Sequence, residues 1–281
     1  MSVQRKRYPR IVLRFFLVLI AFITLFPLLW GISCSLRSDT EIFQYARPLS
    51  FHTFFPVQVT FESYVSIFRD FGFQRPIINT LYVSAITIVL GCLINSVAAL
   101  AFAKFEFKGK KPIFFVILIS FMIPFESIAL PLYGVVNSFH WVNTFSGIII
   151  PCLADGLVLF LFNQFFKDFP QSILEAAKID GASMPRLYTR IVLPLSTPVF
   201  VTAGLMIFMN QWNAYLWPLV IARSPEIRLV QIALASFKME RVTLWSCLYA
   251  ASMVSALIPL FLFLPFQKYY VQGITSSGIK G

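Results

Sequence analysis

Six long apolar runs are the feature that most constrains how this chain can fold. Each run has about the 20 residues that a helix needs to cross the ~30 Å hydrocarbon core of a bilayer. The runs cover residues 11–36, 77–103, 113–136, 147–166, 193–221 and 244–267. A backbone inside lipid must satisfy its own hydrogen bonds, so each run is predicted to be helical. The predicted fold class is therefore an all-α membrane protein with six transmembrane helices.

The composition agrees with burial in a membrane. The chain is 58% hydrophobic and only 12% charged, which is about half the charged fraction of a soluble domain. A net charge of +11 invites a nucleic-acid-binding interpretation. However, the Lys and Arg residues stand in short connections beside apolar runs, where they set the orientation of a membrane protein. We therefore expect a protein that contacts membrane lipid and no nucleic acid.

The placement of the basic residues predicts which side each connection faces. Lys and Arg are more numerous in the connections on the side of the N-terminus than in those on the other side. The basic segments on that side are 1–14, 104–111, 167–190 and 268–280. The positive-inside rule therefore makes both termini and the connection 167–190 cytoplasmic. The N-terminus resembles a signal peptide, but its apolar run is too long and five more follow, so we expect no cleavage.

This topology predicts three parts of the chain. A basic cytoplasmic N-terminus (1–10) precedes a six-span domain (11–268), and a cytoplasmic tail (269–281) follows. The largest extracytoplasmic piece is 37–76, which is rich in Phe and Pro and is expected to pack across the outer mouth. The charged connection 167–192 joins the fourth and fifth runs.

That connection begins with helix signals. Ser172 and Glu175 have the spacing of a capping box, in which a hydroxyl and a carboxylate satisfy free amides at a helix start. The helix is predicted to run through Ile179 and to stop at Asp180-Gly181, because glycine accepts the left-handed backbone of a helix C-cap.

The second half of the connection predicts another short helix. Ser183 is expected to cap it, and Pro185 is tolerated in its first turn. Leu193-Pro194 then redirects the chain into the fifth run. The small side chains of Ala176 and Ala177 would let another protein approach the first helix closely. The prediction is a helix-turn-helix at the cytoplasmic membrane surface.

Three motifs carry a resemblance to a known family. The first is Glu-Ala-Ala at 175–177, followed by Gly181, Ile191 and Leu193-Pro194. The second, in the fifth run, is Gln-Trp-Asn-Ala-Tyr-Leu-Trp-Pro at 211–218, and the third is the small-residue tail 273–281. The chain resembles carbohydrate-type permeases of ABC importers over nearly its whole length. More narrowly, it is similar to the shorter permease subunit of maltose-like and glycerol-3-phosphate-like uptake systems.

The resemblance implies an assembly in a bacterial plasma (inner) membrane. It comprises a second, different permease, two copies of an ABC ATPase, an extracytoplasmic solute-binding protein and a sugar substrate. The chain has no Gly-rich phosphate loop, so ATP and Mg are expected on the ATPase and no cofactor or enzymatic activity is expected in this chain. The resemblance implies ATPase-coupling roles for Glu175, Ala176, Ala177, Asp180, Gly181, Leu193 and Pro194. In the tail, it implies that Ser276, Ser277, Gly278 and Lys280 reach towards the ATPase.

Polar residues inside apolar runs are candidates for lining a cavity, because lipid excludes them. Asp155, in the fourth run, could hydrogen-bond sugar hydroxyls or pair with the partner permease. Glu126 follows a proline in the third run and is a candidate for the cavity or the outer interface. The cluster Asn210, Gln211, Trp212 and Asn213 offers an aromatic face and amides, which suit carbohydrate, but it could equally pack at a helix bend. Asn95 belongs to a small-residue stripe that indicates helix packing.

Two other classes of function are weaker interpretations. A secondary transporter would need internal repeats or an intramembrane ion relay, and Glu126 and Asp155 are the only clearly intramembrane carboxylates. A membrane enzyme would need a convergent catalytic set, and His52 and His140 are isolated. A permease for a phosphorylated polyol is the nearest alternative. The absence of Lys and Arg from the deep parts of the runs favours a neutral sugar.

Overall fold

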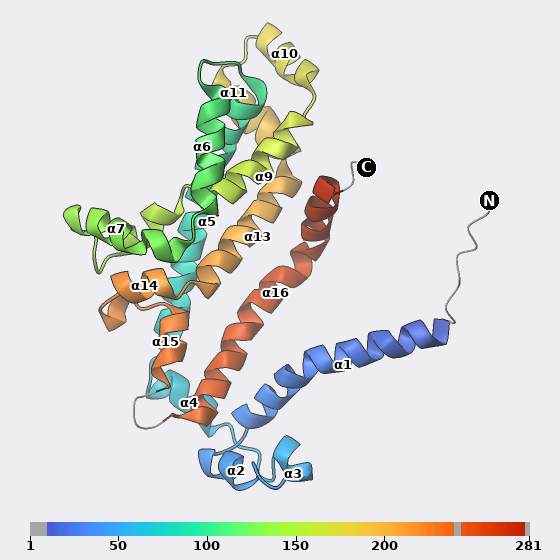
Figure 1. Cartoon of the computed structure of the whole chain (residues 1–281), viewed down its shortest axis with the longest axis vertical. Helices are drawn as coiled ribbons and strands as arrows, with labels where there is room; N and C mark the ends of the chain where they lie inside the picture. Colours follow the sequence, from blue (N-terminus) through green and yellow to red (C-terminus); the bar gives the residue numbers. More distant parts are fainter. Residues whose placement is uncertain (1–9, 239–242, 279–281) are drawn as a thin grey trace. The chain divides into compact units, whose positions relative to one another are not determined.

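The computed structural model describes residues 10–238 and 243–278 of the 281-residue chain (Figure 1). Over these residues every regular element is a helix, which confirms the predicted all-α class. The chain divides into two compact units. The first unit is Met1–Phe73 with Leu234–Ala256, and the second is Gln74–Ala233 with Leu257–Gly281.

The first unit contains the first apolar run and the segment that follows it. Helix α1 (Arg10–Ser35) matches the predicted first run, and its apolar side chains are exposed along its length. That exposure is expected of a helix whose solvent is lipid. Three short helices follow, α2 (Asp39–Gln44), α3 (Phe51–Phe54) and α4 (Glu62–Arg69). The long helix α16 (Trp245–Gly278) begins in this unit and continues in the second.

The second unit is built around α5 (Gln74–Lys104), which packs along α9 (Gly156–Lys167) and α13 (Thr197–Asn213). Figure 1 shows these three helices side by side. The other helices with residues in this unit are α6 (Lys110–Met122), α7 (Phe125–Ser138), α8 (Phe145–Ile149), α10 (Gln171–Ile179), α11 (Met184–Leu187), α12 (Leu193–Leu195), α14 (Leu216–Ile221) and α15 (Val230–Ser236). Single turns of 3-10 helix cover Ile150–Cys152 and Pro225–Ile227, and a π-helical turn covers Tyr188–Val192.

Three of the six runs are not the continuous helices that the sequence analysis expected. The runs at α1, α5 and α16 are each one continuous helix, whereas the other three are helix pairs bent by more than 40°. The largest bend, 104°, separates α6 from α7. Ile123, between them, is extended (ψ 125°) because it precedes Pro124, whose ring excludes the helical conformation of its neighbour.

The other two breaks have similarly local causes. Phe145–Cys152 and Gly156–Lys167 meet at 41°, where Asp155 adopts an extended conformation as the N-cap of α9. Met184–Leu195 and Thr197–Asn213 meet at 83°, at Ser196 between two prolines. The predicted fifth run, 193–221, also ends early, because α13 stops at Asn213 and α14 is a separate helix. The apolar pattern located the spans, and these local residues bend them.

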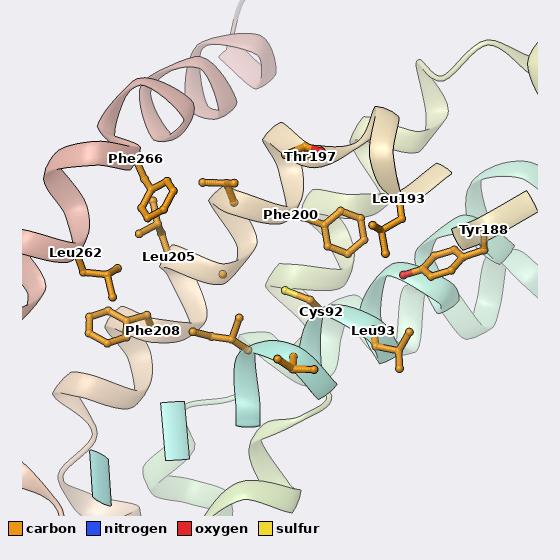
Figure 2. A pocket seen from close by; sticks show the side chains of 14 residues that line it. Cys92, Leu93, Tyr188, Leu193, Thr197, Phe200, Leu205, Phe208, Leu262 and Phe266 are labelled. Carbon is orange, nitrogen blue, oxygen red and sulfur yellow. The ribbon is translucent and has the colours of Figure 1, made fainter. Parts of the chain in front are cut away.

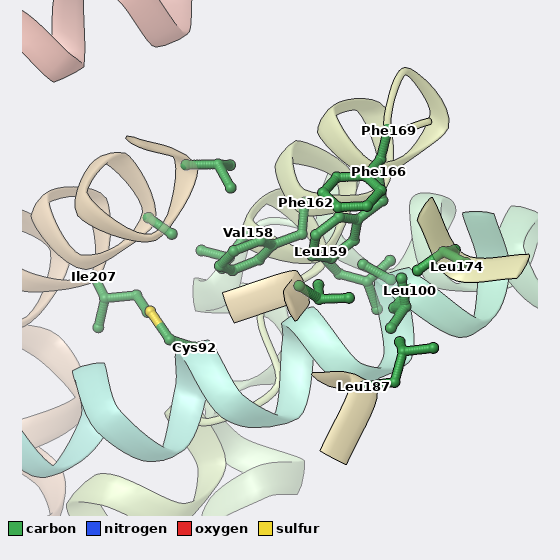
Figure 3. Close-up of a cluster of buried hydrophobic side chains, with 14 of the residues drawn as sticks. Cys92, Leu100, Val158, Leu159, Phe162, Phe166, Phe169, Leu174, Leu187 and Ile207 are labelled. Carbon is green, nitrogen blue, oxygen red and sulfur yellow. The ribbon is translucent and has the colours of Figure 1, made fainter. Parts of the chain in front are cut away.

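The second unit has two hydrophobic clusters. One lies among α5, α9, α13 and the segment 169–192, and it includes Leu100, Phe162, Phe166 and Leu187 (Figure 3). The other surrounds Trp217, whose indole Nε1 donates to the carbonyl of Gly147 at 3.1 Å. A Cβ at Gly147 would collide with the carbonyl oxygen of Trp141, so this close approach of backbone segments requires glycine.

Candidate functional site

Helix α10 lies at the end of the second unit, beyond the ends of α5 and α9 (Figure 1). It stops where the sequence predicted. The amide of Ala182 donates to the carbonyl of Ala177 at 2.9 Å, and Gly181 has φ +74°, which together form a Schellman C-cap. The predicted start differs, because α10 begins at Gln171, so Ser172 lies inside the first turn and not before it.

One face of α10 is anchored in the core. Leu174 and Ala177 are buried against Phe166, Phe169 and Leu187, as Figure 3 shows for the leucines and phenylalanines. Residues three apart lie on the same side of a helix, so this pair fixes the rotation of α10 about its axis. The helix is therefore packed firmly onto the helices beneath it.

The end of α5 supports the same segment. Lys104 Nζ donates to the carbonyl of Phe169 at 2.6 Å and to that of Lys167 at 3.3 Å. In the adjoining loop, Lys110 Nζ lies 2.8 Å from Glu106 Oε1, and this hydrogen bond lowers the pKa of the Glu106 carboxyl. Polar contacts thus tie the ends of α5 and α9 to the chain that leads into α10.

The opposite face of α10 is exposed. It presents Glu175 and Ala176, and the exposed Asp180 and Gly181 follow at the cap. Ile179, one turn after Glu175, is 86% exposed. Ile179 was predicted only as part of the helix, and its place on the exposed surface was not predicted. A helical-wheel projection of 171–179 would have found it, because Leu174 and Ala177 define the buried side.

The chain returns to the spans through one continuous stretch, Met184–Leu195. Ser183 precedes it in the extended conformation expected of an N-cap, although its carbonyl, rather than its side chain, accepts the Leu187 amide at 2.8 Å. The π-helical turn Tyr188–Val192 follows. Leu193 and Pro194, the next predicted coupling residues, are exposed. Isolated π-helical turns occur frequently at functional sites.

Asp155 has a structural role that the sequence analysis did not anticipate. Its Oδ1 accepts from the amides of Leu157 at 2.8 Å and Val158 at 3.1 Å, which caps α9. Its own amide donates to Asn95 Oδ1 at 3.2 Å, and Asn95 Nδ2 donates to the carbonyl of Leu153 at 2.8 Å. The buried Asn95 thus joins α5 to the start of α9, as expected for a packing residue.

The polar cluster of the fifth run divides between two environments. Gln211 and Trp212 are buried, with Trp212 stacked on Phe208 at 5.4 Å between ring centroids. Asn210 and Asn213 are exposed, and Asn213 Nδ2 donates to the carbonyl of Met209 at 2.8 Å. The structure therefore does not gather the four side chains on one surface.

The other predicted site residues lie far from this cluster in the chain. Glu126 is exposed in the first turn of α7, just beyond the 104° bend. The tail residues Ser276, Ser277 and Gly278 form the last turn of α16. The side chains of the tail, and Lys280 as a whole, lie outside the described residues.

Figure 2 shows a groove of about 610 Å³ in the second unit. Apolar side chains from α5, α13 and α16 line it, including Leu205, Phe208, Leu262 and Phe266. Polar lining is limited to groups such as the Tyr188 hydroxyl and Thr197. Asp155, Glu126 and the cluster 210–213 do not line the groove. Its chemistry suits apolar groups and not sugar hydroxyls. Among the described residues, no group of three His, Cys, Asp or Glu side chains could hold a metal ion.

Comparisons with known proteins agree with this architecture. A solved bacterial ABC transporter involved in the import of the acidic polysaccharide alginate has a chain that superposes with a TM-score of 0.82 at 21% identity, covering 96% of this chain and 99% of that one. The arabinooligosaccharides transport system permease protein AraQ of Halalkalibacterium halodurans is 33% identical over 93% of each chain. The trehalose/maltose transport system permease protein MalG of Thermococcus litoralis is 31% identical over 97% of each chain.

A family model provides the remaining evidence. The model described as "binding-protein-dependent transport system inner membrane component" matches residues 88–275, which include α10, the π-helical turn and the bent fifth run. The predicted resemblance to carbohydrate-type permeases of ABC importers is thereby confirmed. The chain belongs to the family of inner membrane components of binding-protein-dependent transport systems.

Proposed function

We propose that this chain is the membrane-spanning permease subunit of an ATP-driven importer that translocates a sugar or oligosaccharide. The observation that carries the proposal is α10. It has one face locked into the core by Leu174 and Ala177, and an opposite face, with Glu175 and Ile179, left exposed beyond the spans. A soluble partner can therefore push on this helix and move the helices beneath it. The named transport systems of the relatives, which carry arabinooligosaccharides and trehalose or maltose, support the sugar class.

The assembly follows the family pattern. The chain pairs with a second, different permease, and an extracytoplasmic binding protein delivers the substrate. Two copies of an ABC ATPase dock from the cytoplasm and bind ATP and Mg, so this chain does no chemistry itself. The excess of basic residues on one side of the membrane supports cytoplasmic N- and C-termini, with α10 on the same side, in a bacterial plasma membrane.

The mechanism is rigid-body linkage. ATP closes the ATPase dimer, and α10 moves with the ATPase groove that holds Glu175, Ala176 and Gly181. Its buried face passes the displacement to α5 and α9, because packed cores switch between discrete arrangements and do not deform continuously. Leu193 and Pro194 mark the end of the segment that moves, and the Ser276–Gly281 tail reaches towards the same ATPase interface. The permease cavity then alternates between inward-facing and outward-facing states.

The substrate contacts proposed for this chain come from the fourth and fifth runs and from the start of α7. Asp155 uses one carboxylate oxygen to cap α9 and is only half-buried, which leaves the other oxygen for a sugar hydroxyl. Exposed Asn210, Asn213 and Glu126 can contact the substrate or the partner permease, whereas Gln211 and Trp212 are buried. The alternative substrate, a phosphorylated polyol, would need a cation from the partner. A secondary transporter would need no ATPase at all.

Co-expression tests the proposal. The chain, its partner permease and its ATPase are purified together in detergent, as wild type and with Glu175→Ala, Ile179→Ser or Gly181→Ala. We expect the ATPase to co-purify with the wild type and to hydrolyse ATP at a rate that depends on the permease. The Glu175 and Ile179 variants should lose association or coupling, and Gln164→Ala, away from α10, serves as the control. A wild-type chain that never associates with an ATPase would refute the proposal.

A further inference from the structure

The segment after α1 has an unusual surface for a connection between spans. Residues 48–61 contain no Asp, Glu, Lys or Arg. Their large apolar side chains are nevertheless exposed, with Leu49 at 77% and Phe51 at 69% of their full area. Phe55, which stacks on Phe51 with 4.4 Å between ring centroids, is exposed as well. A contiguous exposed apolar patch marks a surface that contacts a protein, a ligand or a membrane.

The same segment folds back along α1. The rings of Phe54 and Phe26 are 5.9 Å apart, and Ser33 Oγ donates to the carbonyl of Phe54 at 2.6 Å. Phe26 precedes the end of α1, Ser35, by nine residues, which is about 13 Å along a helix at 1.5 Å per residue. The interfacial layer of each leaflet is only about 5–7 Å thick. The backbone of α3 lies beside Ser33, near the end of α1, and the Phe54 ring extends from there towards Phe26, at the depth of the hydrocarbon.

A buried polar network holds the segment against the end of α1. Arg37 is almost fully buried, and its guanidinium donates to Ser33 Oγ at 2.9 Å and to the carbonyl of Thr53 at 3.2 Å. Glu41 lies 3.6 Å from the Arg37 Nε and accepts from the amide of Val57 at 2.8 Å. These contacts direct the charged groups inwards, so the apolar side chains of the segment face out.

A cavity of about 380 Å³ lies between this segment, α1 and the start of α16, all within the first unit. Its lining includes Phe26, Trp30, Phe43, Trp245 and Tyr249. Tryptophan and tyrosine are the residues that concentrate where a membrane meets water. The cavity lining thus combines Trp and Tyr with the buried Arg37, and it extends to the level of Phe26.

We propose that residues 49–55 form an aromatic wedge that dips into the outer leaflet, and that the adjoining cavity holds one acyl chain of a phospholipid. The occupant is lipid because the patch is uncharged and continues the exposed apolar face of α1, itself a membrane span. The wedge replaces the expectation that this segment packs across the outer mouth. The proposed membrane orientation decides only which leaflet the wedge enters. The wedge can therefore be disproved without disproving the proposed importer function.

Accessibility of spin labels tests the wedge in the complete importer reconstituted in liposomes. Phe51→Cys and Phe55→Cys carry the label, with Leu19→Cys in the middle of α1 and Arg69→Cys on α4 as the lipid and water standards. The unsubstituted chain gives the background from its four native cysteines. We expect the labels at positions 51 and 55 to be more accessible to oxygen than to a water-soluble nickel chelate, as the label at position 19 is. Access to the chelate, as at 69, would place the segment in water. Shielding from both reagents would mean that a partner protein covers it, and either result overturns the proposal.

A photoactivatable phospholipid with a diazirine midway along its acyl chain tests the cavity. We expect crosslinks to the peptides that contain Trp30 and Phe43. Ala46 lines the cavity, so Ala46→Trp should fill it and reduce the crosslinks several-fold, while Val65→Trp, at an exposed position on α4, should leave them unchanged. Leu49→Trp, at an exposed lining position, replaces Ala46→Trp if that variant does not assemble. Crosslinks that persist when the cavity is filled would contradict the acyl-chain assignment.

Discussion

The hydroxyl of Tyr188 lies 2.7 Å from the hydroxyl of Ser96. Tyr188 opens the π-helical turn that returns the chain from α10 to the fifth run, and Ser96 is buried in the last third of α5. The pair is therefore a direct polar link between the segment that we propose contacts the ATPase and the helix at the centre of the second unit.

We expect Tyr188→Phe to weaken the coupling of hydrolysis to transport without preventing assembly. A single hydrogen bond contributes about 0.5–1.5 kcal/mol, which is enough to shift a conformational equilibrium up to roughly tenfold. The measurement is sugar molecules transported per ATP hydrolysed, for Tyr188→Phe, Ser96→Ala and the double variant. If the effects of the two substitutions are additive, the hydroxyl pair does not couple the Tyr188 turn to α5.

We expect substitution of Gly181 to affect ATPase association only through the backbone conformation at the end of α10. Its φ is +74°, and a Cβ there would meet no atom within 4 Å, so Gly181→Ala brings strain without a clash. A left-handed non-glycine residue costs about 1–2 kcal/mol. We expect Gly181→Ala to loosen the end of α10 and reduce ATPase association, and Gly181→Asn, which tolerates this conformation better, to restore part of it. Equal loss in both variants would point to contact with the partner and not to backbone strain.

The two faces of α10 should respond differently to substitution. Ile179→Ser changes an exposed side chain, so the thermal stability of the purified permease should be unchanged while ATPase association falls. Leu174→Ala removes a buried side chain and should cost about 2–5 kcal/mol of stability. Thermal unfolding and co-purification of both variants check this. Loss of thermal stability in Ile179→Ser would contradict the assignment of Ile179 to the exposed face of α10.

Asp155 can be tested as a cap and as a sugar contact. Asp155→Ala removes the cap of α9 and should cost about 0.5–2 kcal/mol. Asn also caps helices, so Asp155→Asn should preserve assembly while raising the sugar concentration needed for half-maximal uptake. Unaltered uptake kinetics in Asp155→Asn would remove this residue from the proposed sugar contacts.

Local signals in the sequence predicted much of this structure. The end of α10 follows from Gly181, because a left-handed cap is a property of one residue and its neighbours. The bend at Pro124 has an equally local cause and was missed because only the apolar pattern was considered. The contact of Asn95 with the start of α9 joins residues about sixty positions apart, so no periodicity could reveal it. The division of 210–213 into buried and exposed side chains likewise depends on neighbouring helices.

The most direct test of the account is uptake of a labelled oligosaccharide by liposomes that contain the complete importer and its binding protein. ATP on the side of α10 is compared with proton and sodium gradients imposed without ATP. We predict uptake that requires ATP and the binding protein, and that falls when Glu175 and Ile179 are replaced together. Uptake driven by an ion gradient without ATP would contradict the account.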